Sequence, residues 1–495
     1  MFELEKERVF YYFEKISSIP RESGNEKAVS DWVLSWTKTL GLEAAQDAAF
    51  NLVIRKKASA GYETAAPVIL QAHMDMVCEK TPESSHDFTK DPILLKVEND
   101  WLTSACKTSL GADNGIGMAC AMAILEDDSL AHPPLEVIFT VEEETTFKGA
   151  NSISPELFYS KRMINLDHAD EKELIAGSCG GTGVMFTLPL SWEKCENSEL
   201  GKNENAGYEA YEIKVCGLKG GHSGEDIHRG RGNAIQLLFR VLQEIVSVGG
   251  KVISVYGGTN RLAISREAQA MVLINDRQAA EEKITAMKAV FQKEFGKSAP
   301  DLDVMMESAV TKISENERIC YLKDSEFEKM AAVVRLFPDG IISMSGDFPG
   351  QVDSSNNLGI IRAFPETGEL QVISEIRGLY RTMVEDTKSR IEMLGSLFGA
   401  KVEYFAGYVS WEYAQDSCLR KTALDVYKKM FGEEMKVSTV HAGLEGGMFT
   451  EKEPEMDIIS IGPSCQYFHS PMERVSIRSV KKFYGFLTAL LAKLK

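Results

Sequence analysis

The chain has 495 residues, of which 44% are hydrophobic and 26% charged, and this predicts two or more globular units. Its 73 acidic residues exceed its 55 basic residues, giving a formal net charge of -18. Nucleic acid and anionic membranes are not expected as partners, because both would repel a chain of this charge.

The cysteines and the N-terminal residues indicate a cytoplasmic protein. The nine cysteines are odd in number and widely scattered, with no C-x-x-C pair, which is typical of reduced thiols. The N-terminal stretch lacks the basic head and uninterrupted apolar run of a signal peptide. Polar residues interrupt the apolar stretches before they reach membrane-spanning length, so no membrane segment is expected.

The first third of the chain predicts alternating helices and strands. Apolar residues at helical spacing predict helices over residues 2–17 and 26–40. Short apolar runs at 67–72 and 135–141 predict buried strands. Between them, residues 111–128 form a glycine-rich turn that leads into an apolar helix. This order predicts an α/β domain with a mixed, mainly parallel sheet and flanking helices, whose active residues lie on loops beyond the strand ends.

The middle of the chain has a different pattern and is interpreted as an inserted α+β domain. It begins near residue 183, contains a polar, hinge-like stretch at 196–207 and ends near residue 405. Its elements alternate, with strands at 208–218 and 268–276 and helices at 233–246 and 281–295. The chain then returns to the first domain with a strand at 456–462 and an amphipathic helix at 480–494. The predicted catalytic domain is therefore formed by 1–182 and 406–495, with 183–405 inserted between them.

Five short segments place acids and histidines at predicted strand ends. They are QAHMDMV with His73 and Asp75, SLGADNGIG with Asp113, TVEEETTFKGA with the glutamates 142–144, MINLDHAD with Asp167, and IGPSCQYFHSPMERV with His469. His73 and Asp75 stand two residues apart and project from one face of a strand, where the carboxylate can fix the tautomer of a ligating imidazole. The glutamate cluster at the end of a buried strand would suffer strong repulsion without a cation.

Each segment alone has an ordinary structural alternative. An H-x-D pair arises by chance, an acid after a strand is usually a turn or a helix cap, and the glutamates could form a solvated edge. All five segments together, at strand ends of one domain, favour a metal centre. Histidine and carboxylate ligands without clustered cysteines suit catalytic zinc, cobalt or manganese. Five or six such ligands fit two ions about 3.5–4 Å apart, with a spare glutamate as general base.

The sequence resembles the aminoacyl-histidine dipeptidases of the PepD type, a branch of the di-zinc aminopeptidase-like metallopeptidases. The resemblance covers nearly the whole chain through HMDMV, LGADNGIGMA, EE-x4-GA, INLD followed by GSCGG, GLKGGHSGEDIHRGRGNA, VDSSNNLG, HAGLEGG and IGPSCQYFHSP. It implies a zinc-peptidase-like catalytic domain with an inserted lid and dimerisation domain. It also implies metal-dependent hydrolysis of dipeptides, with Xaa-His and other unblocked dipeptides as substrates.

The resemblance assigns a role to each candidate site residue. The implied ligands of two divalent ions, zinc first and cobalt or manganese as alternatives, are His73 and Asp167 for one ion, Glu144 and His469 for the other, and Asp113 as the bridge. Asp75 would orient His73. Glu143 would take a proton from the water between the ions and return it to the leaving amine. The chain departs from the family pattern at Thr146, where a glycine is usual, and at Lys107, where a small residue is common.

Substrate contacts are also implied. Arg377 in SEIRGLY is the candidate for binding the C-terminal carboxylate of the substrate through paired hydrogen bonds. Glu445 and Gly446 in HAGLEGG would border the substrate. Asn260 in GGTNRLAI stands two residues before the position of the family's asparagine, which is Leu262 here, and could be a shifted substitute.

The resemblance further implies a homodimer. His222, in GLKGGHSGEDIHRGRGNA, would reach the oxyanion formed in the other chain's site, whereas the structural alternative is a histidine that caps a glycine-rich turn. His441 could be a packed loop residue. Two other functions stay open: a related di-metal N-acyl amino-acid deacylase or tripeptidase, and a non-catalytic scaffold.

Overall fold

The computed structural model describes residues 7–194, 207–309 and 319–495. The chain divides into two compact units: unit 1 is Met1–Ser178, Trp411–Val440 and Leu444–Lys495, and unit 2 is Cys179–Ser410 and His441–Gly443. The predicted domain borders fall within two strands of unit 2 that pair with each other, β9 (Gly180–Pro189) and β21 (Lys401–Tyr408). Apart from its last residue, the hinge-like stretch predicted at 196–207 lies outside the described residues.

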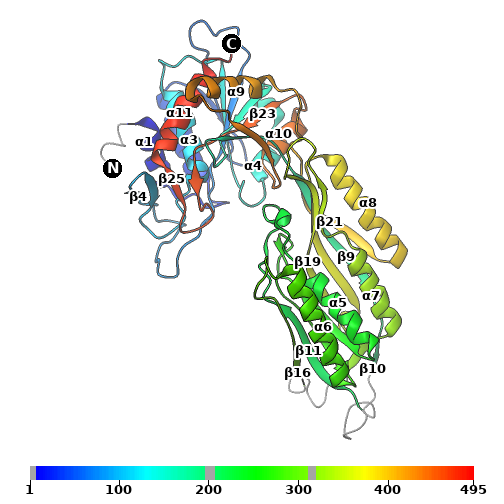
Figure 1. Ribbon diagram of the computed structural model, residues 1–495. Coiled ribbons are helices and arrows are strands. Elements are labelled where there is room, and N and C mark those ends of the chain that lie inside the picture. The colour runs from blue at the N-terminus through cyan, green and yellow to red at the C-terminus, as the bar shows by residue number, and fades with distance from the viewer. Residues whose placement is uncertain (1–6, 195–206, 310–318) are drawn as a thin grey trace. The chain divides into compact units, whose positions relative to one another are not determined.

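Unit 1 is built on an eight-stranded mixed sheet (Figure 1). Its order is β1 (Glu43–Gln46), β2 (Leu52–Lys56), β6 (Leu135–Thr140), β3 (Val68–His73), β7 (Arg162–Asn165), β23 (Asp457–Ser460), β8 (Glu173–Ser178) and β22 (Lys436–Val440). The strands β6, β3, β7 and β23 are parallel to one another, and β1 and β2 form an antiparallel edge. The predicted mixed, mainly parallel sheet is thereby confirmed.

Helices and the sheet of unit 1 share one continuous hydrophobic core. The helices are α1 (Arg8–Ser17), α2 (Lys27–Thr39), α3 (Ala112–Glu126), α4 (Lys148–Ser152), α9 (Cys418–Phe431), α10 (Gly446–Lys452) and α11 (Ile477–Leu491). Leu70 and Val137 point into the core that α1, α3, α9 and α11 line, whereas Ile69 and Ile138, on the opposite face, are also buried. Burial on both faces explains why these strands are continuously apolar, as predicted.

A small four-stranded sheet completes unit 1. Its order is β24 (Cys465–Gln466), β25 (Arg474–Ser476), β5 (Trp101–Ser104) and β4 (Leu95–Glu98). The loop between β24 and β25 carries His469. After this sheet, α11 begins at Ile477, three residues earlier than predicted, because the Ser476 side chain accepts a hydrogen bond from the Ser479 backbone N–H.

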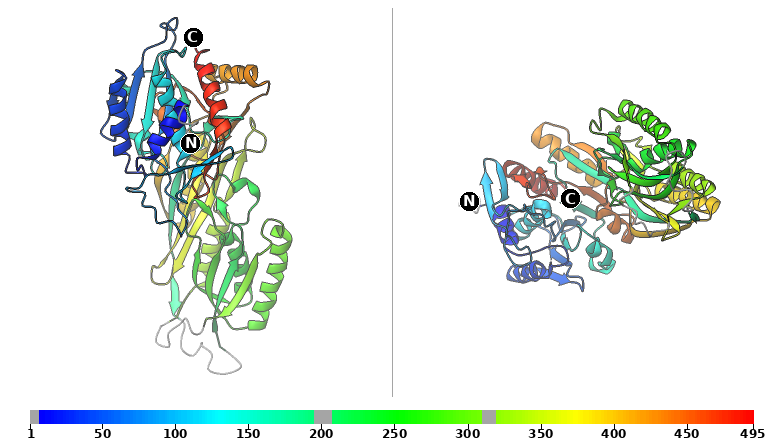
Figure 2. Two further views of the ribbon diagram at one scale, coloured as in Figure 1. Left: turned by 90° about the vertical axis from the view of Figure 1, so that its left-hand side faces the viewer. Right: turned by 90° about the horizontal axis from the view of Figure 1, so that it is seen from below.

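Unit 2 contains a nine-stranded antiparallel sheet with helices on one side (Figure 2). The order is β16 (Asp303–Ser308), β11 (Glu209–Cys216), β15 (Ala268–Ile274), β13 (Lys251–Gly257), β19 (Val352–Phe364), β20 (Glu369–Gly378), β9 and β21, with β18 (Gly340–Met344) also paired to β19. The helices are α5 (Ala234–Ser247), α6 (Arg277–Phe295), α7 (Asp324–Leu336) and α8 (Arg381–Phe398). Their side chains form a second hydrophobic core with the sheet, which confirms the predicted α+β insertion.

Unit 2 also contains two short pairs of strands. The pair β12 (Gly221–His222) and β14 (Ala263–Ile264) is antiparallel, as is the pair β10 (Trp192–Lys194) and β17 (Cys320–Leu322). The helix predicted at 281–295 is α6, which begins earlier, at Arg277, because Asp276 caps it by accepting from the Ala279 N–H.

Across the described residues, we find no helix whose length and apolar character would allow it to cross a membrane.

Candidate metal centre

The first candidate ligand stands at the end of a central parallel strand. His73 is the last residue of β3, and its side chain is buried. Because β6, β3 and β7 run parallel, their carboxyl ends meet at one edge of the sheet. Glu143 and Glu144 follow β6, and Asp167 follows β7. The predicted convergence of the strand-end residues is therefore present.

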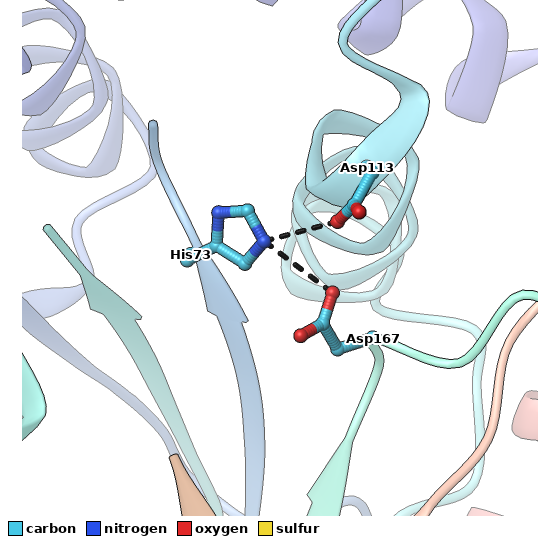
Figure 3. A group of neighbouring side chains, drawn as sticks. All are labelled: His73, Asp113 and Asp167. Atoms are coloured by element: carbon cyan, nitrogen blue, oxygen red, sulfur yellow. Dashed lines mark hydrogen bonds and ion pairs between the residues drawn. The ribbon is translucent and has the colours of Figure 1, made fainter. Parts of the chain in front are cut away.

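The two ring nitrogens of His73 face different carboxylates, and Figure 3 shows the nitrogen that faces both Asp113 and Asp167. Its Nε2 lies 3.0 Å from Asp113 Oδ1 and 3.4 Å from Asp167 Oδ1. Its Nδ1 lies 3.2 Å from the Asp75 backbone carbonyl oxygen and 3.3 Å from Asp75 Oδ1. A histidine that binds a metal through one nitrogen commonly donates the other N–H to a carboxylate. The geometry fits Nε2 as the ligand atom and Asp75 as the group that orients the ring.

Asp113 connects this group to a second one. Its Oδ1 faces His73, whereas its Oδ2 lies 3.4 Å from His469 Nε2. The same nitrogen of His469 is 3.0 Å from Glu144 Oε2. Among the described residues, three sets of side chains place possible ligand atoms within 4.8 Å of one another: His73, Asp113 and Asp167; His73, Glu143 and Glu144; and Asp113, Glu144 and His469. Asp113 thus lies between two groups of possible ligands and belongs to both.

The Asp75 carboxylate also binds the backbone of the turn after β6. Its carboxylate accepts hydrogen bonds from the backbone N–H groups of Glu143, at 3.0 Å, and Glu144, at 3.1 Å, and from the Ser23 hydroxyl at 2.8 Å. These bonds fix the turn after β6 against the end of β3. The role of Asp75 in holding both glutamates was not predicted, because it depends on backbone groups that no sequence motif displays.

The electrostatics of the centre reflect an excess of buried and partly buried carboxylates. Burial, reinforced by neighbouring acids, raises the pKa values of Glu143, Glu144 and Asp167. Burial also opposes ionisation of Asp113, but hydrogen bonds from His469 and His73 outweigh it and lower its pKa. A donor set of carboxylates and imidazoles without thiolates is chemically suited to divalent ions, whose charge would relieve this repulsion. The residues present therefore fit a metal centre.

Glu445 and Gly446 lie at the start of α10 in unit 1. The Glu445 side chain is only 1% exposed, and its Oε2 accepts hydrogen bonds from Gln71 at 2.5 Å and from Thr140 at 2.8 Å. Burial raises its pKa to about 7. A Cβ at Gly446 would lie 3.0 Å from the Trp411 ring, so a larger residue here would require this ring to shift by a few tenths of an ångström. The Glu445 side chain binds the strand ends that carry the centre, and its contact with substrate stays a prediction.

Unit 2 brings together a second group of polar side chains, which we name the unit 2 cluster: Arg377, Ser223, Ser355, His441 and His222. The buried Arg377 guanidinium donates to the Tyr408 hydroxyl at 2.8 Å and lies 3.4 Å from Ser223 Oγ. Ser355 pairs with Arg377 across β19 and β20, and its hydroxyl is 2.7 Å from His441 Nε2. Burial, followed by the charge of Arg377, lowers the pKa of His441 to about 3. His441 therefore packs within this cluster.

His222 has a defined tautomer. Its Nδ1 accepts hydrogen bonds from the backbone N–H groups of Gly224, at 3.3 Å, and Glu225, at 3.2 Å. A neutral imidazole that accepts at Nδ1 carries its proton on Nε2. His222 thus both closes a glycine-rich turn, as the structural alternative held, and holds an Nε2–H donor.

Three further sequence features have local roles in the structure. The Asn260 side chain accepts a hydrogen bond from the Leu262 N–H at 2.9 Å and so closes its own turn. Thr146 donates from its hydroxyl to Glu142 at 3.0 Å. Lys107 has a φ of 57°, a left-handed conformation in which a glycine would be less strained. A substrate contact of Asn260 stays a prediction.

Two buried residues of unit 1 that contact the centre were not predicted from the sequence. Glu473, in the His469 loop, accepts hydrogen bonds from the backbone around Asp113, and Arg21 donates to the carbonyl groups that follow His73. Glu473 belongs to the same IGPSCQYFHSPMERV motif as His469, and this shared motif is the one feature of the sequence that points to Glu473. Nothing around Arg21 in the sequence marks it.

Comparison with known proteins decides the family. The model of the peptidase family M20/M25/M40 matches residues 69–493. The chain belongs to this family. It is 34% identical to the cytosol non-specific dipeptidase of Escherichia coli (strain K12) over 490 residues, covering 97% of this chain and 96% of the relative.

Solved structures agree with this M20-family assignment. The aminoacylhistidine dipeptidase from Vibrio alginolyticus matches with a TM-score of 0.87 and 31% identity, over 98% of this chain and 96% of that one. A tripeptidase from Staphylococcus aureus matches with a TM-score of 0.54 and 14% identity, over 99% of this chain and 98% of that one, and this likeness concerns the fold alone. The predicted resemblance to the dipeptidase branch is confirmed.

Proposed function

We propose that the protein is a cytoplasmic metal-dependent dipeptidase that hydrolyses Xaa-His and other unblocked dipeptides. The observation that carries the proposal is the position of Asp113, whose two oxygens face His73 on one side and His469 on the other. The names of the Escherichia coli and Vibrio alginolyticus relatives support the substrate class and, for the first, the cytosolic location.

The proposed cofactor is a pair of divalent ions, with zinc as the first candidate and cobalt or manganese as alternatives. The ligands would be His73 and Asp167 for one ion, Glu144 and His469 for the other, and Asp113 for both. When bound, such ions polarise a peptide carbonyl and lower the pKa of a water molecule toward about 7.

Glu143 is the proposed proton carrier. One of its carboxylate oxygens lies within 4.8 Å of a possible ligand atom of His73 and of one of Glu144. Its backbone N–H donates a hydrogen bond to the Asp75 carboxylate. Its carboxylate would accept a proton from the attacking water and donate it to the leaving amine. The new carboxyl and amino termini would then form without a proton from the solvent. Asp75 keeps both His73 and Glu143 oriented during this transfer.

Recognition of the substrate is assigned to the unit 2 cluster. Arg377 would bind the C-terminal carboxylate, since a guanidinium can offer two parallel N–H donors to it. His222 would donate from Nε2 to the oxyanion that develops at the carbonyl. The fixed tautomer of His222 supports this role, because its Nδ1 is already occupied as an acceptor.

A dipeptide panel tests the proposed function. Metal-depleted protein would receive zinc, cobalt or manganese in turn and would then be offered Xaa-His dipeptides, other dipeptides, tripeptides and N-acetylated amino acids. We expect free amino acids from unblocked dipeptides only, and only after an ion is restored. Cleavage of acetylated amino acids or tripeptides in preference to dipeptides would favour the related deacylase or tripeptidase activity. Absence of hydrolysis with every ion would favour a scaffold.

We further propose that the active form is a homodimer in which His222 of one chain completes the site of the other. Mixing the inactive variants His222→Ala and Glu143→Ala tests this arrangement, because one site of the heterodimer would hold both intact groups. Recovery of activity on mixing would support action between chains. A fully active monomer would exclude it.

A further inference from the structure

Two buried, oppositely charged side chains hold the turn that carries Asp113. Glu473 lies in the loop between β24 and β25, after His469, and Arg21 lies between α1 and α2. Their exposed fractions are 3% and 2%. Neither belongs to the proposed ligand set, and neither takes part in the proton transfer assigned to Glu143.

The Glu473 carboxylate accepts hydrogen bonds from four consecutive backbone N–H groups. Its Oε2 accepts from Leu110 at 2.7 Å and Gly111 at 2.9 Å, and its Oε1 accepts from Ala112 at 2.8 Å and Asp113 at 3.3 Å. The residue that precedes α3 provides no side-chain cap of its own. Glu473 therefore supplies the acceptor that the start of this helix lacks, from a distant part of the chain.

Arg21 binds the same turn from another direction. Its Nη1 donates to the carbonyl oxygens of Met74, at 2.9 Å, and Asp75, at 2.7 Å, while its Nη2 donates to the Gly111 carbonyl. Gly111 has a φ of 70°, and a Cβ there would overlap the Arg21 guanidinium. The guanidinium thus joins the residues after His73 to the residues before Asp113.

We propose that Arg21 and Glu473 are positioning residues that set the separation of His73 and Asp113 and tie both to the His469 loop. Through this clamp, the affinity of both ion sites would depend on two side chains that touch no ion. Partners that orient ligand residues commonly change metal affinity by roughly 10- to 100-fold when they are replaced. The inference rests on the proposed metal centre and extends it to the residues behind the ligands.

The test is Glu473→Gln, which keeps the size of the side chain but turns an amide N–H toward backbone N–H donors. Metal-free protein would be titrated with Co²⁺ in competition with a chromophoric chelator, and the visible spectrum of the bound Co²⁺ would be recorded. We expect roughly 10- to 100-fold weaker binding at both sites and a changed spectrum. Thermal unfolding of the metal-free variants would be measured alongside.

Glu136→Gln is the matched control. Glu136 is also a buried carboxylate of unit 1 that accepts from consecutive backbone N–H groups, those of Tyr159 at 3.1 Å and Ser160 at 2.9 Å. Its other partner is the Arg55 side chain, at 3.4 Å, so its contacts lie outside the proposed ligand set. We expect this variant to bind Co²⁺ with wild-type affinity and spectrum, even if it unfolds at a lower temperature.

Arg21→Lys provides a second route if Glu473→Gln does not fold. It retains the charge but replaces a planar fork with a single ammonium, so we expect weaker Co²⁺ binding at both sites. Wild-type Co²⁺ affinity and spectrum in either folded variant, with only a lower unfolding temperature, would overturn the positioning role. Failure of the wild-type protein itself to bind Co²⁺ would instead overturn the metal centre.

Discussion

The strand-end group of unit 1, formed by His73, Asp113, Glu143, Glu144, Asp167 and His469, and the unit 2 cluster present opposite electrostatic situations. In unit 1, burial raises the pKa values of Glu144 and Asp167, and the charge of Asp113 raises both further. In unit 2, the buried Arg377 lowers the pKa of His441, after the larger effect of burial. The first arrangement favours a bound cation. The second favours a bound anion, such as a carboxylate.

This difference suits the two units to different proposed roles, metal binding and proton transfer in unit 1 and substrate binding in unit 2. A centre of carboxylates is suited to ions and to proton transfer, and it would repel an anionic substrate in their absence. A guanidinium and a neutral N–H donor are suited to the carboxylate and oxyanion of a peptide. The expected effects of substitutions therefore differ in kind: metal content and turnover in unit 1, substrate affinity in unit 2.

The largest effect is expected for Asp113→Ala. Loss of the shared carboxylate should weaken both ion sites together, so turnover should fall below detection. Elemental analysis after gel filtration should find neither ion at full occupancy. Asp127→Ala, at the other end of α3, is the control and should keep both ions. Two fully occupied ions in Asp113→Ala would contradict a shared ligand.

Glu143→Gln should separate chemistry from metal binding. We expect a fall in kcat of roughly 10²- to 10⁴-fold, because the variant lacks a proton acceptor, while the ion content stays near that of the wild type. Steady-state kinetics and elemental analysis measure the two quantities. Glu142→Gln is the control, since Glu142 pairs with Lys148 at 2.6 Å and has no assigned role in the chemistry. Equal turnover of Glu143→Gln and Glu142→Gln would exclude the assignment.

Glu445→Gln should change how the stability of the metal-free protein depends on pH. The pKa of Glu445 is about 7 in the folded state against an ordinary value of 4.5, so the folded protein holds this proton more tightly than the unfolded chain. Stability is therefore lost as the pH rises from about 4.5 to 7, by at most about 3 kcal/mol. Urea unfolding at pH 5 and pH 8 should show a smaller loss in Glu445→Gln. An identical loss in both proteins would refute the assigned shift.

A smaller effect, of a different kind, is expected for Arg377→Lys. Replacing the paired donors should raise KM for dipeptides by roughly 10- to 100-fold, in line with the energy of hydrogen bonds to charged groups. Metal content should not change. Arg240→Lys, which removes a guanidinium paired with Glu294 elsewhere in unit 2, should leave KM as it is. An unchanged KM with a lower kcat would remove Arg377 from substrate binding.

Most secondary structure was predictable because it depends on local pattern. The apolar runs at 67–72 and 135–141 are buried on both faces of the sheet and form β3 and β6. The errors lie at element ends, where a capping side chain decides the first residue. Asp276 begins α6 earlier than its apolar periodicity indicates, because its side chain accepts from the Ala279 N–H.

The sequence by itself determined which residues could form the centre and that they stand at the ends of predicted strands. His73, Asp113 and His469 are marked by residue type and by motif, and the comparisons confirm the family. Only the tertiary structure decided that Asp113 faces both histidines, that Asp75 holds the backbone of the glutamates, and that Arg21 and Glu473 clamp the turn between them. The contacts of Asp113 join side chains from segments that are far apart in the sequence. The contacts of Asp75, Arg21 and Glu473 run from side chains to backbone groups of distant segments, and every residue has the same backbone groups.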